Sequence, residues 1–400
     1  MLARAIATMI ATAVIIGAVT LPAQARIRVY EDGDKFIEMG ARLQLQYLYL
    51  GSDDGAGGIA GLDRGNTDLL FFRRARPYIA GSLIKNWYGK FAFDFGKAED
   101  ANEVAVKDMW FEYQGWKNTN LYIGNSKTPF SREFQTSSTK LQLVERTFTG
   151  DHNFGTPDRM LGFAIRRKEG NAGKLTYRAA VGAENHDPGM NRMDLDTPVN
   201  RALDWNEGIV VSGRVDWNPL GFMRFDRGDF HTDKWLFNLS AGAYGWWNDG
   251  DNNTYTGDDG LTIDPDGGKV DLDRAAGVEF SGGVRGKGLS ADAEYNFING
   301  DLVDKTFTGG LYRNGKTDLT KFSVNAGYMV LHNHLELVLG YSMLDADNYE
   351  DAWTRAQFGL NWFLHKYNLR FQGNYWLVQN VLGVKDADSG TVLAQGQFLF

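Results

Sequence analysis

The chain has 400 residues, of which 48 are glycine, 8 are proline and none is cysteine. The absence of cysteine excludes disulfides, thiolate nucleophiles and zinc–thiolate or iron–sulfur sites, and the formal net charge of −8 argues against a general nucleic-acid binder. Aromatic residues make up 13% of the chain. Together with the many glycines and few prolines, they favour a β-rich protein with tight turns.

The first 25 residues have the pattern of a secretory signal peptide. Arg4 supplies a positive charge, residues 5–19 are apolar, and residues 23–25 (Ala-Gln-Ala) have the A-x-A form of a cleavage site. The apolar stretch is shorter than the roughly 20 residues of a spanning helix, which makes an uncleaved membrane anchor the weaker alternative. We therefore expect an exported mature chain of residues 26–400, which forms one domain.

From residue 36 onward, apolar and polar residues alternate along many short segments. In residues 36–49, for example, Leu43 and Leu45 share one face while Gln44 and Gln46 share the other. Successive side chains of a strand point to opposite sides, so each such segment has one apolar and one polar face. The pattern predicts sixteen strands, at residues 36–49, 69–84, 87–97, 104–115, 119–127, 159–169, 173–184, 208–218, 234–247, 274–287, 289–299, 319–331, 334–345, 352–364, 366–380 and 391–400.

Short turns and long Gly/Asp-rich connections join these segments, as in an outer-membrane barrel. A soluble β-sandwich or propeller also alternates, but we favour an all-β, transmembrane antiparallel β-barrel because the polar faces carry so many charges and amides. After residue 25 no apolar stretch is long enough for a spanning helix. Aromatic residues gather near the strand ends, where they suit interfacial girdles: Tyr47, Tyr49, Trp87, Tyr88, Trp116, Trp246, Trp247, Trp362, Phe363 and Trp376.

The most distinctive connection is residues 128–158. It is less acidic than the other long connections, and it carries basic residues together with four phenylalanines, Phe130, Phe134, Phe148 and Phe154. Apolar side chains of this kind are unfavourable in free solvent. We therefore expect the segment to fold into the lumen as a constriction loop, with packing on a neighbouring subunit as the alternative.

The chain ends in an aromatic alternating strand in which Phe398 and Phe400 share one face. This ending resembles the recognition signal that outer-membrane barrels present to their assembly machinery. We expect that machinery to be a partner through Phe400.

Five motifs stand out between residues 68 and 165: Phe72-Arg73-Arg74-Ala75-Arg76, KDMWFEY at 107–113, IGNSKTPF at 123–130, Ser137-Ser138 and LVER at 143–146. In this order and spacing they resemble the phosphate-selective porin family of the porin O/P type. The resemblance implies a homotrimeric, sixteen-stranded outer-membrane channel that favours anions, with its third external loop folded inward. That loop would be residues 128–158 here.

A barrel of sixteen strands leaves an aqueous lumen, whose charges decide which ions pass. Alternation places Arg74 and Arg76 toward the lumen, with Phe71 on the opposite face and Arg73 at an interface. Inward acids such as Asp94 and Asp108 offer the alternative that each arginine is a wall ion pair. The expected pore-lining and anion-binding residues are Arg42, Arg74, Arg76, Lys127, Arg132, Arg146 and Arg159.

We therefore expect a passive porin for small hydrophilic solutes that favours anions, with phosphate or polyphosphate as candidate solutes. Its surroundings would be outer-membrane lipid and lipopolysaccharide. A general, weakly selective porin and a non-conducting structural or adhesin barrel are the alternatives.

Enzymatic activity, a cofactor and a metal are not expected. His152 lies in one segment with Asp151, Ser137 and Ser138, yet nothing indicates a Ser–His–Asp arrangement. Divalent-cation binding by loop acids is a weaker hypothesis than ordinary solvated turns; these acids are Asp53, Asp54, Asp249, Asp251, Asp258, Asp259, Asp264 and Asp266.

Overall fold

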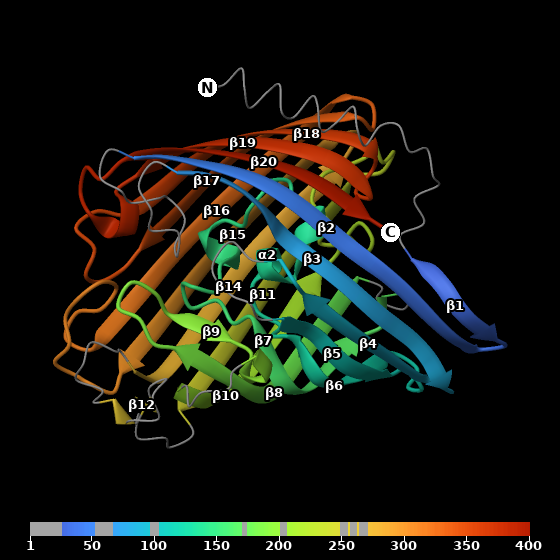
Figure 1. Ribbon diagram of the computed structural model, residues 1–400, viewed down its shortest axis with the longest axis horizontal. Helices are drawn as coiled ribbons and strands as arrows, with labels where there is room; N and C mark the ends of the chain where they lie inside the picture. The colour runs from blue at the N-terminus through green and yellow to red at the C-terminus, as the bar shows by residue number, and fades with distance from the viewer. Residues whose placement is uncertain are drawn as a thin grey trace.

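A computed structural model describes residues 26–52, 67–96, 104–169, 174–200, 206–248, 255–256, 262–263 and 271–400. The expected signal peptide and the eight loop acids named above lie outside these residues. Sixteen antiparallel strands form a closed barrel (Figure 1). They are β2 (Lys35–Ser52), β3 (Thr67–Ile84), β4 (Trp87–Asp94), β5 (Ala105–Tyr113), β6 (Thr119–Lys127), β7 (Arg159–Arg167), β8 (Leu175–Asp187), β10 (Asn206–Trp217), β11 (Leu236–Asn248), β14 (Leu272–Gly286), β15 (Leu289–Leu302), β16 (Lys316–Leu331), β17 (Leu335–Asp345), β18 (Trp353–His365), β19 (Leu369–Gln379) and β20 (Ser389–Leu399).

The barrel closes where β2 pairs with β20, from Arg42 opposite Leu399 to Ser52 opposite Ser389. Each of the sixteen predicted strands corresponds to one strand of the barrel, so the predicted all-β, sixteen-stranded antiparallel barrel is confirmed. Three short pairings were not predicted. β1 (Ile27–Asp32) pairs with the start of β2, β9 (Asp194–Asp196) pairs with the end of β8, and β12 (Tyr255–Thr256) pairs with β13 (Thr262–Ile263).

The two faces of the wall differ as the alternation predicts. In β10, Ile209, Val211 and Val215 are between 46% and 50% exposed on the outside, whereas Arg214 and Asp216 are at most 2% exposed on the inside. An apolar outer face and a polar inner face are typical of a barrel that sits in lipid. No helix of the described residues is long and apolar enough to span a membrane.

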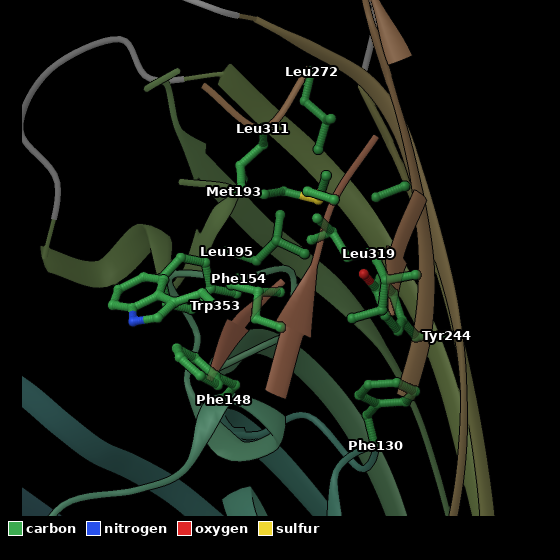
Figure 2. Packing of buried hydrophobic residues seen from close by; sticks show 14 of the residues in the cluster. Phe130, Phe148, Phe154, Met193, Leu195, Tyr244, Leu272, Leu311, Leu319 and Trp353 are labelled. Carbon is green, nitrogen blue, oxygen red and sulfur yellow. The ribbon is translucent and has the colours of Figure 1, made fainter. Parts of the chain in front are cut away.

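An apolar cluster lies between the long connections and the inner face of the wall (Figure 2). Phe130 packs edge-on against Tyr244 of β11, with ring centroids 4.8 Å apart, and Phe148 packs on Trp353 of β18 at the same distance. These contacts give the phenylalanines of residues 128–158 an apolar environment away from water. Burial of this kind is the main source of stability for such a segment.

Four aromatic residues predicted for the girdles lie on the inner side of the barrel instead: Trp246, Trp376, Phe363 and Tyr88, whose hydroxyl donates to the inward Glu38 Oε1 at 3.2 Å. Trp246 and Trp376 are fully buried and Phe363 is 1% exposed, whereas Trp247 and Trp362 are 50% and 44% exposed on the outer surface. The prediction was wrong for these four because it relied on closeness to a strand end, whereas adjacent residues of a strand point to opposite faces. Inside, the indole of Trp246 donates a hydrogen bond to the carbonyl of Glu184 (2.6 Å).

Glycines on the inner face let residues 128–158 approach the wall closely. A Cβ at Gly283 of β14 would lie 2.6 Å from Arg132 Nη2, and one at Gly327 of β16 would lie 2.1 Å from Gln142 Nε2. Such distances are shorter than real Cβ contacts allow. The missing side chains at these positions therefore make room for the segment.

Candidate functional site

A cavity of about 1570 Å³ runs inside the barrel along strands β2 to β8. Its lining includes Asn86 and Gln114, which lie in short turns at one end of the strands, and Gly96 and Asp187, which lie at the opposite end. The lining therefore extends over the full height of the wall. The end of the barrel that holds the turns of Asn86 and Gln114 is called the short-turn end below.

Six of the seven predicted site residues line this cavity, and one does not. Arg132 is fully buried at the start of α2 (Arg132–Gln135), and its Nε donates a hydrogen bond to Asp292 Oδ1 of β15 at 3.0 Å. Its guanidinium therefore binds the wall instead of facing the cavity. The six residues that the structure brings together are Arg42, Arg74, Arg76, Lys127, Arg146 and Arg159.

Part of this basic set is compensated by neighbouring acids. Arg76 Nε donates to Asp94 Oδ2 at 2.5 Å, and Arg159 Nη1 donates to Asp158 Oδ1 at 2.6 Å. Asp108 also accepts from Arg159 at 3.3 Å. At these positions the wall ion pairs considered from the sequence are present, so these arginines contribute less net charge to the cavity.

Three other residues of the set are held by neutral groups. Arg42 Nη1 donates to Ser138 Oγ at 2.8 Å. Lys127 Nζ and Arg146 Nη2 both donate to the carbonyl of Thr136, at 3.2 and 3.0 Å, just after the end of α2. Each of these hydrogen bonds therefore fastens residues 128–158 beside the cavity through a partner that carries no charge.

The lining of the cavity as a whole is basic. It contains seventeen Lys or Arg residues and twelve Asp or Glu residues, an excess of five positive charges. The complete chain has the opposite sign, with a formal net charge of −8. Positive charge is thus concentrated along the one large internal cavity found in the described part of the barrel.

The structure corrects the predicted orientations of Arg73 and Phe71. A β-bulge shifts the pairing between Gln44 and Leu45, which lie opposite Arg74 and Phe72. The extra residue reverses the alternation, so Arg73 and Phe71 line the cavity, and Arg73 Nε donates to Glu145 Oε1 at 2.8 Å. The prediction was wrong because it assumed an unbroken period of two.

A second internal segment was missed entirely from the sequence. Residues 218–235, here called the strap, connect β10 to β11 at the short-turn end. Its residues Phe222 to Asp226 line the cavity. The ring of Phe225 lies 4.8 to 5.1 Å from three guanidinium groups, those of Arg132, Arg178 and Arg214. The available signal was the presence of three phenylalanines in a connection at the end where turns are short.

His152 forms an ion pair rather than a catalytic arrangement. Its Nδ1 lies 2.6 Å from Asp194 Oδ1; burial lowers the pKa of His152, but the carboxylate outweighs burial and raises this pKa to about 10. Ser138 is occupied by Arg42 instead. Within the described residues, no three His, Cys, Asp or Glu side chains are grouped so that they could hold a metal ion.

Comparisons with solved structures find barrels of outer-membrane proteins. OmpT of Vibrio cholerae has a TM-score of 0.56 and 12% identity, over 93% of this chain and 99% of that chain. OmpF of Salmonella typhi has a TM-score of 0.55 and 14% identity, over 93% and 100%. The anion-selective porin of Comamonas acidovorans has a TM-score of 0.54 and 12% identity, over 90% and 98%. At these identities the likeness establishes the fold alone.

No curated protein sequence matches the chain. A family model does match: phosphate-selective porin O and P, over residues 50–199. These residues contain the five motifs and most of the basic cavity wall, and the match and the fold together support a porin channel rather than an enzyme. Residues 50–199 thus match the phosphate-selective porin O and P family that the five motifs resemble, and they form part of a closed sixteen-stranded barrel of the outer-membrane type.

Proposed function

We propose that the protein is an outer-membrane porin that passes small hydrophilic solutes passively and favours anions. The observation that carries this proposal is the excess of five positive charges along a cavity that extends over the height of the barrel. Charges that line a narrow aqueous path select ions of the opposite sign. The match to phosphate-selective porins makes phosphate, with polyphosphate, the first solute to test.

Residues 128–158 are proposed to narrow the lumen. They bind strands that lie far apart around the barrel: Arg132 binds Asp292 of β15, the amide of Val144 donates to Asn374 of β19 at 2.6 Å, and Ser138 accepts from Arg42 of β2. A segment with partners on these strands reaches across the interior. It leaves the space along β2 to β8 as the path for solutes.

Arg42 is the strongest candidate for direct contact with a passing anion. Its guanidinium has Ser137 and Ser138 hydroxyl groups as partners, at 3.4 and 2.8 Å. Hydroxyl groups do not neutralise the charge, and they can donate to an anion that the arginine attracts. Arg76 and Arg159 have acidic partners, so we expect them to attract anions more weakly; Arg74, Lys127 and Arg146 complete the proposed path.

The surroundings of the barrel follow from its outer face. The exposed apolar side chains of the strands would contact outer-membrane lipid and, at the end with long connections, lipopolysaccharide. We propose a homotrimer because the outer-membrane protein OmpT of Vibrio cholerae, which has this fold, was also solved in a trimer form. Phe400, which is 38% exposed, is proposed to contact the barrel assembly machinery.

The test is a reversal potential measured in planar bilayers under a potassium chloride gradient, repeated with added phosphate. We expect anion selectivity, block of the chloride current by phosphate, and a loss of selectivity of about two- to fivefold in Arg42→Gln, from one unit charge near the path. Lys85→Gln, in the exposed turn after β3, is the matched control and should behave as the parent.

Other outcomes would favour the alternatives. Weak or cation selectivity without phosphate block would indicate a general porin. Folded trimers that form no channels would indicate a structural or adhesin barrel.

A further inference from the structure

The strap is much longer than the other described turns at its end of the barrel. The turn between β14 and β15 is only Lys287-Gly288, whereas the strap has the eighteen residues 218–235. Its beginning is bound to the wall through Asn218, whose backbone N–H donates to the backbone carbonyl of Lys174 at 2.7 Å. The extra length allows it to leave the wall and cross the short-turn end.

The contacts of the strap trace its course across that end. Asp229 accepts from the amide of Gly288, in the β14–β15 turn, at 2.7 Å. Further along, the ring of Phe230 packs on Phe363 of β18 at 4.9 Å and on Tyr367, in the β18–β19 turn, at 5.1 Å. The strap therefore reaches from β10 to β18 and β19, and it covers the short-turn end over these strands.

The strap also forms hydrogen bonds and an ion pair with residues 128–158. The amide of Arg227 donates to the carbonyl of Lys140 at 3.0 Å, and Thr136 Oγ1 donates to the carbonyl of Phe225 at 3.0 Å. Lys140 Nζ forms an ion pair with Asp226 Oδ2 at 2.5 Å. The two segments are thus stacked, and both border the cavity on the side away from β3 to β8.

We propose that the strap is a second selectivity element, at the exit from the channel, and that the Lys140–Asp226 pair sets the charge there. The inference rests on the proposed porin function. Both side chains line the cavity, and they are 30% and 31% exposed, so neither is sealed off from a passing ion. As a pair they present no net charge, but either one alone would place a unit charge beside the path.

This arrangement predicts that substitution of Asp226 and substitution of Lys140 shift the anion-to-cation permeability ratio in opposite directions. Asp226→Asn leaves Lys140 unopposed and should raise the anion-to-cation permeability ratio, whereas Lys140→Gln leaves Asp226 unopposed and should lower it. We expect a change of about two- to fivefold each way, from one unit charge a few ångströms from the path. Asp34→Asn is the control, because Asp34 is an exposed acid at the same end that does not line the cavity.

The outcomes separate this inference from the proposed function. Opposite shifts in the two variants, with the control unchanged, support the strap as a selectivity element. If both variants keep the parent ratio while Arg42→Gln still loses selectivity, the inference is wrong and the porin function stands. If the parent protein forms no channels, the porin function itself fails.

A chemical test avoids the risk that a substitution disturbs folding. The chain contains no cysteine, so Asp226→Cys and Asp34→Cys each create a single thiol. A small anionic thiosulfonate, added to open channels from the short-turn side, should reduce the chloride current of Asp226→Cys and leave Asp34→Cys unchanged. An Asp226→Cys channel whose thiol reacts without any change in current or selectivity would overturn the inference.

Discussion

The two halves of the barrel wall use inward charges in different ways. Along β3 to β5 the pairs border the cavity and keep some exposure: Arg76 is 16% exposed in its pair with Asp94, and Lys90 is 26% exposed in its pair with Asp108. Along β14 and β15 the charges are sealed, as in the pair of Arg132 with Asp292, whose side chains are 0% and 1% exposed. An inward-facing charge therefore does not by itself mark the path of an ion.

The sealed half holds the internal segments in place. Asp292 accepts from Arg132 and from Arg285, and Arg227 of the strap lies 3.7 Å from it. One carboxylate thus joins residues 128–158, the strap and the wall. The exposed half, by contrast, supplies the charges that solutes would meet. Substitutions in the two halves should accordingly affect stability in one case and selectivity in the other.

The largest effect is expected from Asp292→Ala. It would leave three guanidinium groups without their shared carboxylate in a buried site, which costs about 3–5 kcal/mol. We expect a lower free energy of unfolding and a noisier channel with higher conductance. The exposed pair of Asp273 with Lys305 provides the contrast, because Asp273→Ala should cost about 1 kcal/mol or less. Equal losses from both variants in denaturant unfolding would contradict the distinction.

An intermediate effect is expected from filling the space that the inner-face glycines leave. Gly327→Ala places a methyl group 2.1 Å from Gln142 Nε2, so the amide of Gln142 must shift and its hydrogen bonds to Ser290 and Glu336 are disturbed. Overpacking of this kind costs about 1–3 kcal/mol. Gly373→Ala on β19 is the control, since nothing lies within 4 Å of the added Cβ. Thermal unfolding of the two variants, with conductance beside it, measures the difference; identical behaviour would show that residues 128–158 do not press on the wall.

The smallest effect is expected from a change of pH that deprotonates His152. The pKa of His152 is raised to about 10, above the ordinary value for histidine, so the imidazole is protonated at neutral pH. The stabilisation from its pair with Asp194 is therefore fully present below the unfolded pKa of about 6.5 and is lost as the pH rises through 10.

His152 also lines the cavity, so its charge adds to anion selectivity over the same range. His152→Gln should lower the selectivity slightly at pH 7 and remove one component of its decline toward pH 10. The difference between parent and variant, measured across this range, isolates the histidine from the lysines. A constant difference up to pH 11 would refute the assignment.

The wall could be predicted from the sequence because its rule is local. A period of two identifies a strand and its faces from neighbouring residues alone, and it placed Arg42, Arg74 and Arg76 correctly toward the inside. It failed at the bulge beside Arg73, where one extra residue reverses the alternation, although the non-alternating run from Phe71 to Arg74 was a visible sign.

The interior was harder to predict because its contacts join distant parts of the chain. Arg132 was expected to face the cavity, yet its partner is Asp292, and no local pattern connects these two residues. The strap likewise depends on β14, β18 and residues 128–158 for its course. Trp246 and Trp376 were assigned to the girdles from their place near strand ends; alternation puts them on the inner face, but it does not reveal that internal segments give them apolar neighbours there.

The pairing of β1 with β2 has a consequence for how the barrel avoids unwanted association. β2 begins at Lys35, but β20 ends beside it near Ala41, whose amide donates to the carbonyl of Phe400 at 2.7 Å. The stretch from Lys35 to Met39 would therefore expose free backbone donors and acceptors, a template on which another chain could add a strand. β1 folds back and pairs with this stretch. β1 thus covers the part of the β2 edge that β20 leaves unpaired. Removal of β1 would promote edge-to-edge aggregation without changing the channel lining.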